Sequence, residues 1–245
     1  MKPIDSARYD AVTFDCYGTL IDWDTGIANQ LGPWAVRTQF PATVAELIGR
    51  FADHQRKHQA GRPIQAYRAV LRAALADAVA DFAGSITSRD LDAFAAGVGS
   101  WPAFPDSIDA LRQLKQMGKH LGVLSNVDNA SFDTTHRQLG GQIDTIVTAE
   151  VVGAYKPDRA MFEALFEALA ARGIARDRVL HVAQSQFHDV APGQALGLDV
   201  IWIDRRQGRP GRGVTIPSDA EPTARFTNLD RFARALGESN SRGRS

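Results

Sequence analysis

The sequence predicts an α/β protein with a doubly wound parallel sheet and a helical insert after the first strand. Two observations lead to this fold class. Short, nearly continuous apolar runs alternate with helical patterns, as is typical of strands buried on both faces of a sheet. In addition, about a hundred residues separate the first apolar run from the second, far more than a simple crossover connection needs.

Five strands are expected, and each is a short apolar run of four or five residues. They lie at residues 11–14, 120–124, 143–147, 179–183 and 200–203. Apolar residues recur at threes and fours between the later strands, which places each set on one stripe of a helix. The two clearest sets are Ile108, Leu111, Leu114 and Met117, and Met161, Leu165 and Leu169.

The interval after the first strand consists of Ala-rich helical segments. We expect helices at residues 25–39, 42–59, 66–83 and 88–97, separated by turn residues such as Pro41 and Gly84-Ser85. The predicted helical insert therefore covers residues 21–100, and the α/β core covers residues 1–20 and 101–236. The Gly-, Pro- and Arg-rich stretch 205–222 is expected to be a solvated loop, and the polar tail 237–245 to be disordered.

Composition excludes several classes of function. The 245 residues are 44% hydrophobic, and 28 Lys and Arg residues balance 28 Asp and Glu residues. A chain without net positive charge has little long-range attraction for nucleic acid. Its single cysteine, Cys16, allows no disulfide framework, and no apolar run approaches the roughly 20 residues of a membrane span. No signal peptide is recognisable, so we expect a cytoplasmic protein with no membrane partner.

Polar residues follow the predicted strands where active sites form in open α/β sheets. Taken singly, an Asp or a Ser-Asn pair there is more often a helix cap or a turn former than a catalytic group. The candidates gain weight from their order along the chain. They are Asp15, Tyr17 and Thr19, then Ser125 and Asn126, then Lys156, and finally Ser185, His188 and Asp189.

The residue types suggest covalent catalysis. Asp15 can attack an electrophilic atom and form an ester intermediate, and Lys156 can favour its anionic form. Asp189 can accept a proton from the water that hydrolyses the ester. The hydroxyls of Thr19 and Ser125 can fix Asp15 or an anionic group of the substrate. The amide of Asn126 is suited to the same task.

The order Asp, Ser-Asn, Lys-Pro and acidic residue resembles the haloacid dehalogenase superfamily over essentially the whole chain. This resemblance implies a Rossmann-like core, and the helical insert is similar to the superfamily's cap.

Phosphatases of the superfamily usually have Asp-x-Asp in the first motif and further acidic groups in the fourth, which bind magnesium. Here Tyr17 replaces the second Asp, and Gln184-Ser185 stands in the fourth motif. Magnesium prefers hard anionic oxygens, so we expect no metal and no cofactor.

The segment Asp-x-Tyr-Gly-Thr-Leu resembles the (S)-2-haloacid dehalogenases of the superfamily. This resemblance implies that Asp15 displaces halide from the carbon next to a carboxylate, and that water then releases a 2-hydroxy acid. Ser125 would bind the substrate carboxylate and Asn126 would face the halide. Ser185 would help Asp189 to position water. Tyr17 would form part of the apolar wall.

Several positions depart from the resemblance or stay open. Phe162 stands where these dehalogenases often have Tyr, and His188 replaces a bulky aromatic residue before the motif-four Asp. One hypothesis is that His188 donates a hydrogen bond to a small leaving group such as fluoride. A cap arginine should contact the carboxylate and halide, but the spacing does not decide between Arg50 and Arg56. The resemblance also allows a homodimer formed through the cap.

Three alternatives keep parts of this interpretation. The same nucleophile could open a strained ring next to a carboxylate or attack another small activated carbon. The chain could be a magnesium-dependent phosphatase of small molecules. It could also be a non-catalytic relative, although retention of Asp15, Lys156 and Asp189 argues against this, because unused charges in a cleft destabilise a protein.

Overall fold

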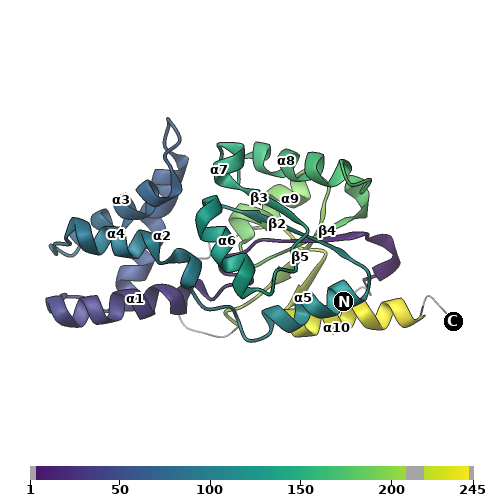
Figure 1. Ribbon diagram of the computed structural model, residues 1–245, viewed down its shortest axis with the longest axis horizontal. Helices are drawn as coiled ribbons and strands as arrows, with labels where there is room; N and C mark the ends of the chain where they lie inside the picture. The colour runs from purple at the N-terminus through teal and green to yellow at the C-terminus, as the bar shows by residue number, and fades with distance from the viewer. Residues whose placement is uncertain (1–3, 208–217, 243–245) are drawn as a thin grey trace.

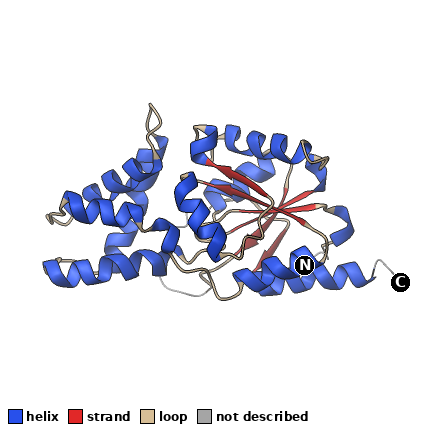
Figure 2. Cartoon of the chain, in the orientation of Figure 1, coloured by secondary structure: helices blue, strands red, loops and turns tan. Residues whose placement is uncertain are grey.

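The computed structural model describes residues 4–207 and 218–242, which form a parallel sheet covered by helices and a separate group of helices at one side (Figures 1 and 2). The strands are β1 (Ala11–Phe14), β2 (His120–Ser125), β3 (Thr145–Thr148), β4 (Val179–Ala183), β5 (Asp199–Ile203) and β6 (Ala224–Phe226). Their order is β3-β2-β1-β4-β5-β6, and every neighbouring pair is parallel. This is the doubly wound order, so the predicted fold class is confirmed.

The sheet is buried on both faces. All residues of β1 and β4 are buried, as their continuous apolar runs predict. Helices α5 (Ser107–Gln116) and α10 (Leu229–Arg242) lie on one face, and α8 (Arg159–Ala170) lies on the other (Figure 1). The order reverses at β1, which lies between β2 and β4. A crevice therefore opens beyond the carboxyl ends of these three strands.

Four helices form the group at the side of the sheet (Figure 1). They are α1 (Trp23–Thr38), α2 (Val44–Ala60), α3 (Tyr67–Ala80) and α4 (Ser88–Ala96). Each lies within three residues of its predicted range at either end. Thr43 and Glu46 make a reciprocal capping box at the start of α2, which satisfies two otherwise free backbone donors. The boundaries of a cap at residues 21 and 100 stay a prediction.

The remaining elements connect strands to helices. Helices α6 (Asn129–Gln138), α7 (Ala149–Val152) and α9 (Ala191–Ala195) follow β2, β3 and β4 along the chain. A π-helical turn at Gln186–Val190 comes before α9 and carries two of the predicted site residues. Single 3-10 turns lie at Ser6–Arg8, Val98–Ser100 and Arg176–Arg178.

Two predictions near the C-terminus were wrong. Strand β6 was not expected, because three residues give too short a pattern; it pairs with β5, with Ala224 opposite Ile201. The expected disorder from residue 237 does not hold for residues 237–242, which continue α10. Helix α10 buries Phe232 and Leu236, and the hydroxyl of Ser239 accepts a hydrogen bond from the amide of Ser6. Residues 208–217 of the expected loop and 243–245 of the tail lie outside the described residues.

Candidate active site

A cavity lies between the carboxyl ends of β1, β2 and β4 and the helix α2. Eight of the nine predicted site residues line it, and the ninth, Thr19, lies behind Asp15. Residues of α2 contribute the opposite wall, among them Gln55, Arg56 and Gln59. The fold therefore brings together groups that are up to 174 positions apart in the sequence, from Asp15 to Asp189.

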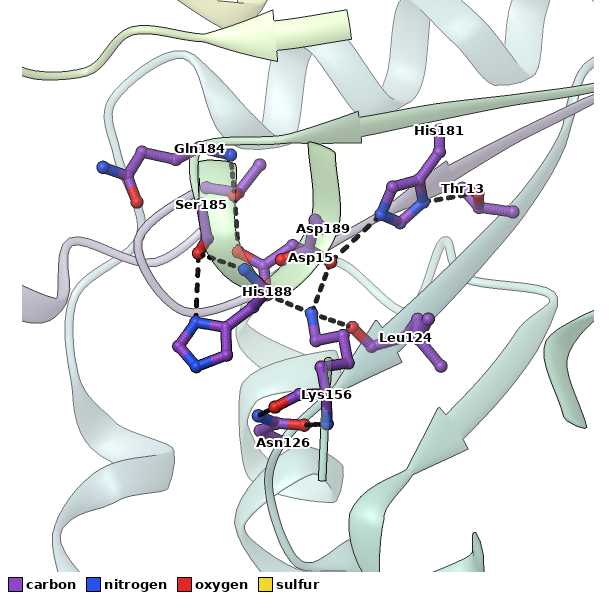
Figure 3. Close-up of polar contacts among 11 residues, drawn as sticks. Thr13, Asp15, Leu124, Asn126, Lys156, His181, Gln184, Ser185, His188 and Asp189 are labelled. Atoms are coloured by element: carbon purple, nitrogen blue, oxygen red, sulfur yellow. Dashed lines mark hydrogen bonds and ion pairs between the residues drawn. The ribbon is translucent and has the colours of Figure 1, made fainter. Parts of the chain in front are cut away.

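Lys156 joins two carboxylates at the centre of the site (Figure 3). Its Nζ atom lies 2.8 Å from Asp15 Oδ1 and 2.7 Å from Asp189 Oδ1. A third hydrogen bond, of 2.8 Å, reaches the carbonyl oxygen of Leu124 at the end of β2. An ammonium group has three hydrogens, so these partners fix its orientation. The side chains of Lys156, Asp15 and Asp189 are only 2%, 10% and 0% exposed.

Burial and charge act against each other in this group. Desolvation raises the pKa of Asp15, and the charge of Asp189 adds to this effect, while Lys156 opposes it. Desolvation also acts to raise the pKa of Asp189, but the charge of Lys156 and hydrogen bonds from His181 and Lys156 outweigh it and lower the pKa. The two carboxylates overcome the burial of Lys156 and raise its pKa, which keeps the ammonium charged.

The side chain of Thr19 holds the second oxygen of Asp15. The hydroxyl of Thr19 donates to Asp15 Oδ2 at 2.6 Å and accepts from the amide of Gln184 at 2.8 Å. Gly18 has φ +98°, a conformation that side chains disfavour, and it turns the chain back toward Asp15. Both oxygens of Asp15 therefore accept a strong hydrogen bond, and its carboxylate has one orientation.

Ser125 and Asn126 differ in what they contact. The hydroxyl of Ser125 is buried at the cavity and has no hydrogen-bond partner within the described residues, so it is free to meet a ligand. Asn126 Oδ1 accepts from the amide of Lys156 at 2.6 Å, and its Nδ2 donates to the carbonyl of Lys156 at 3.1 Å. The sequence led us to expect the Asn126 amide to face a halide; in the structure it clamps the backbone of Lys156 (Figure 3).

Tyr17, Ser185 and His188 also reach the cavity. The ring of Tyr17 packs edge-on against Trp101, and its hydroxyl bonds to Thr135 of α6 at 2.8 Å. Ser185 Oγ accepts from the amide of His188 at 3.1 Å and lies 3.0 Å from its Nδ1 atom. Burial lowers the pKa of His188 to about 4, so its imidazole is neutral near pH 7.

The structure distinguishes the two candidate cap arginines. Arg56 lines the cavity, whereas Arg50 lies outside it and approaches Asp81 at 3.9 Å. Arg56 also contacts Asp53 on its own helix. The difference follows from position: the two residues are six apart on α2, so they point to different sides of the helix.

Two important residues are not apparent from the sequence. His181, on β4, contacts Asp189 at 3.1 Å from within the core. Arg205, expected in a solvated loop, has a side chain that is only 8% exposed; it pairs with Asp106 at 2.9 Å and donates to the carbonyl of Thr19 at 2.7 Å. It thereby anchors the loop that carries Asp15. In sequence, one looks like a core residue and the other like a surface arginine.

Two other features are absent from residues 4–207 and 218–242. No group of three or more His, Cys, Asp or Glu residues there is arranged to hold a metal ion. No helix in this part of the chain is long and apolar enough to cross a membrane.

Comparison with known proteins identifies the family. Residues 9–197 match the family model described as haloacid dehalogenase-like hydrolase. This match covers more than half of the chain, and the fold and motif order agree with it. The chain belongs to the haloacid dehalogenase-like hydrolases.

The individual relatives have low sequence identity to this chain. The chain is 26% identical over 240 residues to an (S)-2-haloacid dehalogenase of Pseudomonas sp. (strain YL), covering 93% of this chain and 96% of that protein. A second (S)-2-haloacid dehalogenase, from Pseudomonas putida, is 27% identical, but the match spans only 54% of this chain and 56% of that protein. The fold is similar to that of an L-2-haloacid dehalogenase from Xanthobacter autotrophicus, with a TM-score of 0.78, 19% identity and coverage of 94% and 98%.

Proposed function

We propose that the protein hydrolyses small 2-haloalkanoic acids to 2-hydroxy acids through a covalent ester at Asp15, without a metal ion. The observation that carries this proposal is the position of Lys156 Nζ, 2.8 Å from Asp15 and 2.7 Å from Asp189. One ammonium group thus serves a nucleophile and a proton acceptor at once. The names of the relatives, which are 2-haloacid dehalogenases, support the choice of substrate.

In the first step, an oxygen of Asp15 attacks the carbon next to the substrate carboxylate. The new carbon–oxygen bond forms as the carbon–halogen bond breaks, and halide leaves with the bonding electron pair. Thr19 and Lys156 keep the attacking carboxylate in one orientation, which lowers the entropic part of the barrier. The buried, unpartnered hydroxyl of Ser125 is suited to bind the substrate carboxylate, and Arg56 would approach it from α2.

In the second step, water attacks the carbonyl carbon of the ester and Asp189 accepts its proton. The bond between this carbonyl carbon and the oxygen of the product then breaks, and the leaving alkoxide takes the proton that Asp189 holds. The 2-hydroxy acid leaves, and the carboxyl group of Asp15 is regenerated. Asp189 is suited to this role because its lowered pKa keeps it ionised, and it lines the same cavity as Asp15. Neighbouring Ser185 offers a hydroxyl to the water.

The donor set argues for catalysis without a metal. The position that carries a second Asp in magnesium-dependent relatives is Tyr17, whose hydroxyl is turned to Thr135. The inward-facing oxygens of Asp15 and Asp189 already share the positive charge of Lys156. Magnesium favours several anionic oxygens in an octahedral array, whereas of the four carboxylate oxygens of Asp15 and Asp189 only Asp189 Oδ2 is without a hydrogen-bond partner within the described residues.

His188 is proposed to contact the leaving halide. It is neutral, and if the Ser185 hydroxyl donates to Nδ1, then Nε2 carries the hydrogen. Because His188 lines the cavity, Nε2–H can donate to a small, hard leaving group. We therefore expect the protein to turn over fluoroacetate well relative to chloroacetate, better than an enzyme with a bulky aromatic residue at this position would. A strong preference for bromide or iodide would contradict this role.

A substrate panel with halide detection tests the proposal. We expect free halide from 2-chloropropionate or chloroacetate, and the same rate in the presence of EDTA. Hydrolysis of a generic phosphate ester that depends on added magnesium would contradict it. Turnover of a strained ring acid without activity on any haloacid would keep the nucleophile but refute the proposed leaving group.

A further inference from the structure

Behind the catalytic carboxylates, the core contains a histidine that the proposed reaction does not use. His181 is 0% exposed in the middle of β4. Its Nε2 atom lies 3.1 Å from Asp189 Oδ1, and its Nδ1 atom lies 2.9 Å from the hydroxyl of Thr13 on β1 (Figure 3). A histidine buried among apolar strands is costly unless both ring nitrogens find partners, and here both do.

The sheet register builds this contact from three strands. Thr13 lies opposite His181 on one side and opposite Gly122 of β2 on the other. A Cβ atom at Gly122 would come within 2.9 Å of Thr13 Cγ2, so a larger residue there would push Thr13 away. Phe162 packs edge-on against the imidazole, with ring centroids 6.1 Å apart. It is the residue that stands where the resemblance leads us to expect Tyr.

The contacts define how His181 acts on Asp189. An ionised carboxylate can only accept, so Nε2 carries the hydrogen of the bond to Asp189. Thr13 holds the other side of the ring and fixes its plane. Both Lys156 and His181 bond to the same oxygen, Oδ1. Within the described residues, Asp189 Oδ2 has no hydrogen-bond partner, although the residue is completely buried and lines the cavity.

We propose that His181 is a positioning residue for the hydrolytic half of the reaction. By holding Oδ1 from behind, it keeps Oδ2 directed to the water that attacks the ester. The inference rests on the proposed function, in which Asp189 accepts the proton of that water. The first half-reaction, carried out by Asp15, does not need His181. The structure thus separates a group that supports ester hydrolysis from the groups that support ester formation.

Quenched-flow measurements on variants test this inference, using the haloacid that the wild-type protein converts fastest. In His181→Phe, we expect one halide per site to be released in a burst and the ester on the Asp15 peptide to accumulate, as seen by mass spectrometry. The steady-state rate should fall by roughly 10- to 100-fold, which corresponds to the loss of one hydrogen bond to a charged group. His181→Gln keeps a donor near the position of Nε2 and should restore part of the rate.

Two further variants distinguish a specific effect on ester hydrolysis from simple misfolding. Thr13→Val removes only the hydroxyl and should give a smaller accumulation of ester. The double variant Thr13→Val with His181→Phe replaces both polar partners by apolar groups, a change that proteins tolerate better than an orphaned partner. It should fold and still accumulate ester. Folding is checked for each variant by circular dichroism.

The outcomes separate the inference from the proposed function. A folded His181→Phe or double variant in which burst and steady state fall equally, with no more ester than in the wild type, would overturn the inference alone. Absence of halide and ester from the wild-type protein with every haloacid would refute the proposed function, and the inference with it.

Discussion

On the sheet side of the cavity, Lys156 and Asp189 are 2% and 0% exposed and bond to each other, and Lys156 also bonds to Asp15. On the α2 side, the side chain of Arg56 is 33% exposed, and its ion pair is with Asp53 of the same helix. Buried groups with several partners have one geometry, whereas a half-buried arginine with one partner retains more rotamers. The comparison supports our proposal, in which the sheet side performs the chemistry and the α2 side selects and holds the substrate.

The largest effect is expected from the nucleophile. Asp15→Asn keeps the size of the side chain but removes the attacking anion, so halide release should fall by about 10⁴-fold or more. Halide release in single turnover, with circular dichroism as the folding control, provides the measurement. A variant that retains even a tenth of the wild-type rate would show that Asp15 is not the nucleophile.

Lys156→Met should also lower activity strongly, and it should change the pH dependence of kcat/KM. Lys156 lowers the pKa of Asp15 against the effect of burial, so its removal raises that pKa further. Less of the carboxylate is then ionised at low pH, and the acid limb of kcat/KM moves to higher pH. Loss of one partner from a buried ion pair should also cost ~3–5 kcal/mol of stability.

The pH profile of kcat/KM and a urea denaturation curve measure the two effects of Lys156→Met. An acid limb at the same pH as in the wild-type protein would contradict the role of Lys156 in ionising Asp15, whatever the loss of stability.

A smaller, different effect is expected on the α2 side. Arg56→Gln should raise KM for a haloacid by roughly 10-fold, the equivalent of ~1.4 kcal/mol, and change kcat little. The matched control is Arg50→Gln on the same helix, because Arg50 lines a neighbouring pocket but not the cavity that contains Asp15. Steady-state kinetics of both variants test the division of roles. Equal changes in the two variants would show that α2 acts only through its overall charge.

The smallest effect should come from Tyr17→Phe. The hydroxyl of Tyr17 points away from the reacting groups, to Thr135. Its loss should therefore leave kcat within a few-fold of the wild-type value and cost about 1 kcal/mol of stability, the usual value of one hydrogen bond. A large fall in kcat with unchanged stability would mean that the hydroxyl takes part in the reaction.

The sequence predicts much of this architecture because its signals are local. The strands up to residue 203 and helices α1 to α4 follow from apolar runs and helical spacing. Asp15, Lys156 and Asp189 are recognisable because each follows or precedes a predicted element in a known order. The same order of residues indicates the family.

The features of the site that the sequence does not predict depend on contacts between distant segments of the chain. In the sequence, His181 looks like an ordinary member of an apolar strand. Only the register, which places Thr13 beside it, and the π-helical turn, which carries Asp189 to its ring, show its contacts. Similarly, Asn126 could be assigned to Lys156 only once the two loops were seen together. The rotation of α2 about its axis determines that Arg56 and not Arg50 lines the cavity, and spacing alone does not give that rotation.

The covalent ester is the central claim, and isotope labelling tests it most directly. A single turnover in ¹⁸O-labelled water, followed by mass spectrometry of the peptide that contains Asp15, reports where the oxygen of water enters. If water attacks the ester carbonyl, one labelled oxygen should appear in the Asp15 carboxyl and the product should carry an unlabelled one. Label in the 2-hydroxy acid, with none in the Asp15 peptide, would mean that water displaces the halide directly.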